Sequence, residues 1–142
     1  MTTDTRVEFR MTRRFDASPE RVFDAWLDPD KAGRFLFATP EGEMVRVEID
    51  PREGGRYSIV ERRDGEDVEH VGEYLEIDRP RRLVFTLGVP KYSEAVDRVT
   101  VEVAPAEGGS ELTLIHQVSP EWADDVEEGW TMILDGLGEV VR

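Results

Sequence analysis

Residues 109–141 read GSELTLIHQVSPEWADDVEEGWTMILDGLGEVV, and within them a strand pattern gives way to a helix pattern. Leu112, Leu114 and Val118 lie two or four residues apart, which is typical of a strand with one buried face. Ser119-Pro120-Glu121 is a helix-start signal: a capping residue, a proline at the first helical position and an acid near the positive end of the helix dipole. The apolar stripe of the predicted helix comprises Trp122, Val126, Trp130, Ile133, Leu137 and Val140 or Val141. This pattern predicts one long helix that packs one side on a sheet and exposes an acidic side to water.

The chain before residue 109 is dominated by the same two-residue alternation. It covers residues 7–15, 45–49, 57–59, 67–77, 83–87 and 99–103. Asp64-Gly65 is a strong signal for a two-residue hairpin turn. Ser18-Pro19-Glu20 and Asp28-Pro29-Asp30 interrupt the alternation with two short helix starts. We therefore expect about seven antiparallel strands, six of them consecutive, with a short helix pair after the first.

The length of 142 residues fits a single domain, 1–142. The predicted fold class is α+β: a curved antiparallel sheet wrapped around a long C-terminal helix. A sheet curved enough to grip a helix rarely fills all the space between them, so we expect an internal cavity.

The composition excludes several kinds of function. The chain has 18 Lys and Arg against 32 Asp and Glu, a net charge of −14, so nucleic acid and anionic membrane surfaces are not expected partners. It has no cysteine, hence no disulfide and no thiol nucleophile. Two histidines and the absence of an HExxH motif argue against a metal site. The sequence shows neither a signal peptide nor a membrane-spanning stretch, and we expect a cytoplasmic protein.

Four segments in order resemble the family named after the activator of the Hsp90 ATPase (AHSA1-like). They are Phe15–Trp26 with Asp28-Pro29, Gly54–Tyr57, Gly72–Pro80 with Leu83–Thr86, and Leu112–His116 with Glu128–Trp130. The family is similar to the wider START and Bet v 1-like helix-grip group (SRPBCC). The resemblance implies a helix-grip fold with an apolar cavity, and it implies no particular reaction because the fold hosts many functions. Residues 34–38 (RFLFA) stand where family members often have an Arg-Trp-Trp-Gly type segment.

The expected cavity-lining residues come from the helix pair, the inward face of the sheet and the stripe of the last helix. They are Trp26, Phe35, Phe37, Tyr57, Phe85, Leu114, His116, Trp130, Ile133 and Leu134. Apolar pockets with a few convergent polar groups are the usual form of a small-molecule site.

Polar candidates have alternative interpretations. His116 shares the inward face of its strand and is either a satisfied core residue or a polar handle for a ligand. For His70 the direction is undecided, and we expect it to be exposed. Glu61 and Asp97 continue inward faces near strand ends, so they are expected at a solvated rim; inside a cavity either would act as an acid or base. Arg13, also in the inward register, is expected to form a structural ion pair.

The leading functional hypothesis is binding of a small apolar or amphipathic molecule between sheet and C-terminal helix, with no cofactor. One alternative is a cyclase- or hydrolase-type enzyme that uses His116 with Glu61 or Asp97 as acid and base. Another is an interaction module, for chaperones or for self-association, so the expected state is a monomer or homodimer. We assign no residue as catalytic.

Overall fold

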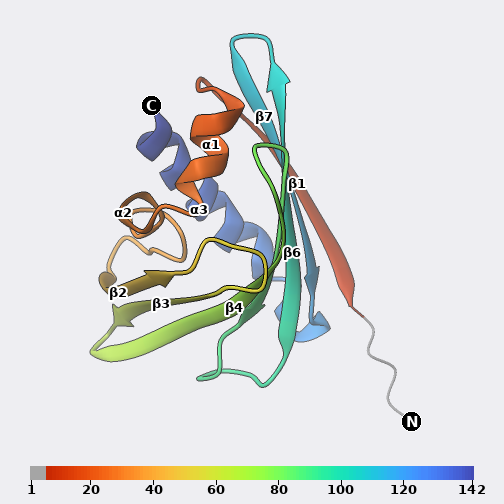
Figure 1. Cartoon of the computed structure of the whole chain (residues 1–142). Coiled ribbons are helices and arrows are strands. Elements are labelled where there is room, and N and C mark those ends of the chain that lie inside the picture. The colour runs from red at the N-terminus through yellow and green to blue at the C-terminus, as the bar shows by residue number, and fades with distance from the viewer. Residues whose placement is uncertain (1–5) are drawn as a thin grey trace.

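The computed structural model describes residues 6–142, except for the side chain of Glu121, and shows a seven-stranded antiparallel sheet (Figure 1). Its strands are β1 (Val7–Phe15), β2 (Glu43–Ile49), β3 (Arg56–Arg63), β4 (Glu66–Asp78), β5 (Arg82–Gly88), β6 (Val96–Ala106) and β7 (Gly109–Val118). The strand order is β1-β7-β6-β5-β4-β3-β2, so β1 returns to pair with the last strand and the other six follow one another. This confirms the predicted fold class.

The helices lie on the concave face of this sheet (Figure 1). They are α1 (Pro19–Ala25), α2 (Pro29–Ala32), a single 3₁₀ turn η1 (Pro120–Trp122) and α3 (Val126–Val141). The two predicted helix starts after β1 are confirmed. The Ser18 hydroxyl accepts from the Arg21 N–H at 3.2 Å, and the Asp28 carboxylate accepts from the Asp30 N–H at 3.0 Å. Each bond satisfies a helix-end donor that lacks an intrahelical partner.

The predicted hairpin between β3 and β4 is also confirmed. Asp64 and Gly65 have φ values of 51° and 80°, the positive angles of a two-residue turn whose twist matches the flanking strands. The resulting register places Ile59 opposite His70 and Tyr57 opposite Gly72. Because successive residues alternate between faces, this register decides which side chains of β4 reach the core.

Aromatic rings fill the middle of the core. The Trp26 and Phe35 ring centroids lie 5.3 Å apart in an edge-to-face arrangement. Trp26 also lies 6.3 Å from Phe85 on the sheet and 6.3 Å from Trp130 on α3. All four side chains are at most 3% exposed. The centre of the sheet–helix interface is therefore packed.

The last helix starts later than predicted. Ser119-Pro120-Glu121 opens only the 3₁₀ turn, and α3 begins at Val126. The Ser119 hydroxyl makes no capping bond because it bonds instead to Asp97 on β6, at 3.0 Å. Trp122 therefore precedes the helix and is 36% exposed, although its spacing placed it on the buried stripe.

Candidate functional site

Free space lies between the sheet and the N-terminal half of α3, in two adjoining pockets. Both are bordered by Leu87 near the end of β5, by Val89 just after it and by Val126 on α3. The first, called here the Asp97 pocket, has a volume of about 190 Å³ and also contacts Asp97, His116, Tyr92 and Trp122. The second, called here the Arg63 pocket, has a volume of about 280 Å³ and also contacts Arg63, His70, Phe37, Thr39, Trp130 and Ile133.

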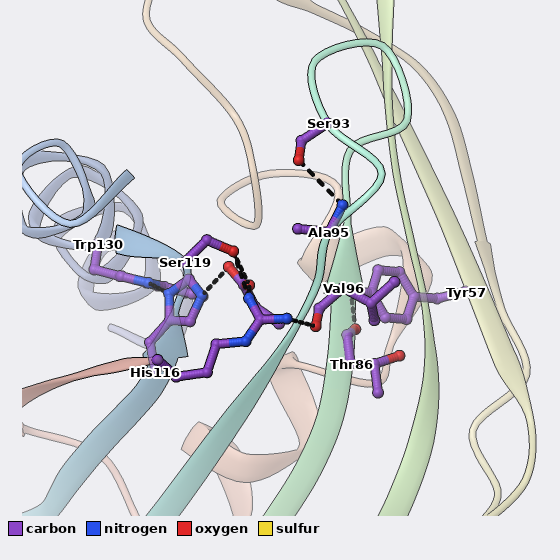
Figure 2. A network of polar contacts seen from close by, with 10 residues as sticks. Tyr57, Thr86, Ser93, Ala95, Val96, His116, Ser119 and Trp130 are labelled. Atoms are coloured by element: carbon purple, nitrogen blue, oxygen red, sulfur yellow. Dashed lines mark hydrogen bonds and ion pairs between the residues drawn. The ribbon is translucent and has the colours of Figure 1, made fainter. Parts of the chain in front are cut away.

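His116 is held between the helix and the sheet by both ring nitrogens (Figure 2). The indole Nε1 of Trp130 donates to Nδ1 of His116 at 2.9 Å, and Nε2 of His116 lies 3.0 Å from Oδ2 of Asp97. An indole nitrogen can only donate, so Nδ1 must be the accepting nitrogen and Nε2 must carry the proton. His116 is 4% exposed, and it is a satisfied residue of the core that also borders the Asp97 pocket.

Asp97 is the centre of a polar network at the start of β6. Besides His116, its carboxylate accepts from the Ser119 hydroxyl at 3.0 Å and contacts the guanidinium of Arg6, which precedes β1. Burial raises the pKa of Asp97, but the hydrogen bonds from His116 and Ser119 and the charge of Arg6 outweigh it and lower the pKa below its usual value. The expectation of a solvated rim is wrong for Asp97, whose side chain is 11% exposed. The structure thus forms the histidine–carboxylate pair considered for an enzyme.

This pair is arranged to hold an imidazole in place. A general base needs a lone pair facing its substrate, within about 3 Å of the heavy atom whose proton it removes. In His116 the Nδ1 lone pair is occupied by the Trp130 indole, and Nε2 faces Asp97. The network therefore links α3, β6 and β7 rather than presenting a base to the pocket.

Glu61 is buried, and the expectation of a solvated rim is wrong for it as well. Its side chain is 1% exposed and forms an ion pair with Arg63, two residues along β3. One carboxylate oxygen also accepts from the Thr39 N–H at 2.5 Å and from the Thr39 hydroxyl at 3.1 Å. The strand end is covered because the 37–42 segment folds back over Glu61. A β-carbon at Gly42 would lie 2.2 Å from the Glu61 carboxylate, so a larger residue there would have to displace the Glu61 side chain.

His70 is buried too, contrary to the expected exposure. Its register with Ile59 places it on the concave face, where the Phe37 ring stacks on the imidazole with centroids 4.4 Å apart. Nδ1 lies 3.3 Å from the Ile59 carbonyl, which can only accept, so the lone pair is on Nε2. Burial, assisted by the nearby charge of Arg63, lowers the pKa of His70 to about 4. His70 is therefore uncharged at neutral pH.

Phe37 has a φ of 59°, in the left-handed region that bulky residues rarely adopt. Its conformation is held by the stack on His70 and by Arg63, which donates to the Phe37 carbonyl at 3.2 Å. Such strain persists only where surrounding contacts over-determine it, and it gathers at functional sites.

The other predicted site residues are dispersed. Trp26, Phe35, Phe85 and Leu114 are buried in the core, and the Trp26 Nε1 donor has no hydrogen-bond partner within residues 6–142. Tyr57 donates to the Thr86 carbonyl at 2.7 Å, and burial raises its pKa well above the usual value.

Two other predicted site residues, Tyr57 and Leu134, border hollows that lie away from the site. Tyr57 borders one of about 600 Å³ over β2–β5, whose rim carries Glu48, Arg56 and Glu73. Leu134 borders another, beside β1, together with Arg13. Arg13 forms an ion pair with Asp135 at 2.7 Å, the structural role expected for it.

The sequence predicted Phe37, His116, Trp130 and Ile133 as cavity residues, and these border the two pockets. Asp97, expected at a solvated rim and considered only as a possible polar group of the cavity, borders one of them as well. The sequence analysis did not identify Arg63 and Thr39 as site residues. The burial of His70 could have been predicted from the Asp64-Gly65 turn, which sets a register that pairs His70 with the inward-facing Ile59.

In residues 6–142 we find no helix long and apolar enough to cross a bilayer. The same part of the chain contains no group of three or more His, Asp or Glu side chains placed to hold a metal ion.

Comparisons with known proteins agree with this architecture. A crystallised protein from Chromobacterium violaceum superposes with a TM-score of 0.87 at 26% identity, covering 94% of this chain and 96% of its own. An AHSA1-like protein from Aeromonas hydrophila superposes with a TM-score of 0.83 at 21% identity, covering 95% and 92%. A protein of unknown function from Staphylococcus aureus gives 0.82 at 24% identity, covering 95% and 93%. No curated protein sequence matches the chain. The model of one family, described as activator of Hsp90 ATPase homolog 1-like protein, matches residues 16–142, and the chain belongs to that family.

Proposed function

We propose that this protein binds a small apolar or amphipathic molecule in the two adjoining pockets beside the N-terminal half of α3. Membership in the family supports a ligand-binding type of fold in general. The observation that carries the proposal is the Arg63 pocket: about 280 Å³, walled by aromatic and aliphatic side chains, with a few polar groups gathered at one end. Small-molecule sites have this character and volumes of roughly 300–1,000 Å³. With the adjoining Asp97 pocket, the space reaches that range.

The enzyme alternative has less support. Its best observation is the His116–Asp97 pair at 3.0 Å beside the Asp97 pocket. Both ring nitrogens of His116 are engaged, one by Trp130 and one by Asp97, so acid–base chemistry would require one of those bonds to break. The binding proposal requires no such rearrangement.

Gly129 offers a direct test, because it is an exposed residue that borders the Arg63 pocket, and a β-carbon there would meet no atom within 4 Å. The phenyl ring of Gly129→Phe would extend from α3 at the edge of the Arg63 pocket. Because glycine is a poor helix former, the substitution should not weaken the helix. We expect the wild-type protein to bind the uncharged dye Nile red with micromolar affinity, measured by fluorescence titration. Gly129→Phe should weaken binding at least about tenfold without destabilising the fold, since filling an apolar pocket removes the site.

The matched control is Glu128→Phe, one residue earlier on α3 and exposed, and not part of either pocket wall. It adds the same ring to the same helix turn and should leave the affinity unchanged. Absence of Nile red binding to the wild type, or an equal effect of the two variants, would rule out this site.

A further inference from the structure

We infer that the Arg63 pocket selects an uncharged ligand head that accepts a hydrogen bond, with Arg63 as its donor. This inference rests on the proposed function and adds the class of ligand. It follows from three features of the polar end of the pocket: its charge balance, its unused donors and the environment of His70.

The first feature is that the charge of Arg63 is already balanced inside the protein. Its Nε contacts the carboxylate of Glu61, a side chain only 1% exposed. Glu61 takes its other hydrogen bonds from the main chain and hydroxyl of Thr39. Among the residues that the structure describes, Arg63 is the one charged residue in the wall of this pocket, so the pocket adds no net positive charge for a bound anion.

The second feature is the set of donors that the ion pair leaves unused. Arg63 also donates from Nη2 to the Phe37 carbonyl at 3.2 Å, whereas Nη1 has no hydrogen-bond partner among the described residues. The Arg63 side chain is 31% exposed, and it borders the pocket. A guanidinium has five N–H donors in a fixed plane and no acceptor. A ligand oxygen here would therefore receive a charge-assisted hydrogen bond without displacing Glu61.

The third feature is that His70 supplies no second positive charge. Burial and the charge of Arg63 lower its pKa to about 4, and the ring is stacked on Phe37. The accepting nitrogen of His70, Nε2, suits a head that donates as well as accepts, such as an amide or a hydroxyl.

An anionic head would gain little in this environment. A carboxylate would lose its hydration in a pocket without net positive charge, in a protein of net charge −14. An amide or hydroxyl loses much less on desolvation and still uses the free Arg63 donor. Charge balance therefore favours the uncharged head.

Three ligands of one shape test this preference: naphthalene, naphthamide and naphthoate, each used at pH 7 to displace Nile red from the wild-type protein. We expect naphthamide to bind at least about tenfold more tightly than naphthalene, the usual gain from a hydrogen bond to a charged group. Naphthoate should bind more weakly than naphthamide. If naphthoate competes as well as naphthamide, or naphthamide no better than naphthalene, the inference fails while the proposed function stands. If Nile red itself does not bind, the proposed function fails.

A double variant identifies the donor. Arg63→Met together with Glu61→Gln removes both charges at once, so neither partner is left buried and unpaired. We expect this variant to lose the preference for naphthamide over naphthalene, with both affinities measured on the variant itself and with its Nile red affinity determined anew. The matched control is Arg62→Met with Asp67→Asn, the neighbouring β3–β4 ion pair at 2.8 Å, which lies outside the pocket walls and should keep the preference. Retention of the preference in the Arg63 and Glu61 variant would assign the donor elsewhere and overturn the inference. If that variant fails to fold, the three-ligand comparison on the wild type still decides.

Discussion

The two halves of α3 belong to one amphipathic helix, yet they meet different surroundings. In the C-terminal half, Leu137 is fully buried and a β-carbon at Gly136 would lie 3.0 Å from Phe35. In the N-terminal half, Val126 is partly buried and a β-carbon at Gly129 would meet nothing within 4 Å. An apolar stripe therefore does not by itself specify a packed core. The stripe is packed where other segments of the chain place side chains against it, and it borders free space where they do not.

Buried polar groups also distinguish the two ends. Beside the N-terminal half of α3, His116 borders the Asp97 pocket and His70 borders the Arg63 pocket. Buried Glu61 forms an ion pair with Arg63 in the wall of the second pocket. The C-terminal half packs mainly on apolar side chains, with an exposed ion pair between Arg13 and Asp135 at its flank. Free space and buried polarity at the same end are what a site for an amphipathic ligand requires.

The largest effect is expected from truncating each half of the stripe in turn. Leu137→Ala removes a fully buried side chain and should lower the free energy of unfolding by about 2–5 kcal/mol. Val126→Ala, at the partly buried end, should cost less than about 1 kcal/mol because few packing contacts are lost. Urea denaturation followed by circular dichroism measures both. Equal losses would mean that the two halves are packed alike.

The next effect concerns acid stability at the polar end. The folded pKa of His70 is about 4, below the ordinary value of about 6.5, so the unfolded chain takes up a proton first as the pH falls. His70 should therefore lower the stability of the wild type between about pH 6.5 and pH 4, by up to about 3 kcal/mol, and this contribution should level off below pH 4.

Comparison with His70→Gln isolates that contribution, because the carboxylates titrate in both proteins. Urea unfolding at pH 7 and at pH 4 should show a drop in stability that is larger in the wild type by about 2–3 kcal/mol. The same drop in both proteins would refute the buried, uncharged state assigned to His70.

The smallest effect is expected at the junction of the two halves. Trp130→Phe keeps most of the buried ring but removes the indole donor, which leaves Nδ1 of His116 without its partner. An unsatisfied buried acceptor should cost about 1–2 kcal/mol in unfolding free energy. Two-dimensional NMR of the imidazole nitrogens should show a changed signal for His116 and an unchanged one for His70. A His116 signal identical to that of the wild type would contradict the assigned hydrogen bond.

Sequence patterns were sufficient for the architecture. Two-residue alternation located the strands, Asp64-Gly65 specified the β3–β4 turn, and Ser18-Pro19 and Asp28-Pro29 marked the short helices. These features depend on local backbone preferences and on which side chains point to the same face of an element, and both can be read from the sequence pattern. The start of α3 was predicted wrongly because the Ser119 hydroxyl donates to Asp97, 22 residues earlier in the chain, and does not cap the helix.

The surroundings of the polar side chains required the tertiary structure. Alternation predicted that Glu61 and Asp97 point inward, but their burial depends on segments that fold over the strand ends, 37–42 for Glu61 and the residues around Ser119 for Asp97. Register assigns a face to a residue, whereas burial and charge balance depend on what covers that face. Local preferences along the chain therefore determined the fold of this protein. Long-range contacts decided where its free space lies and which donor of Arg63 is left for a ligand.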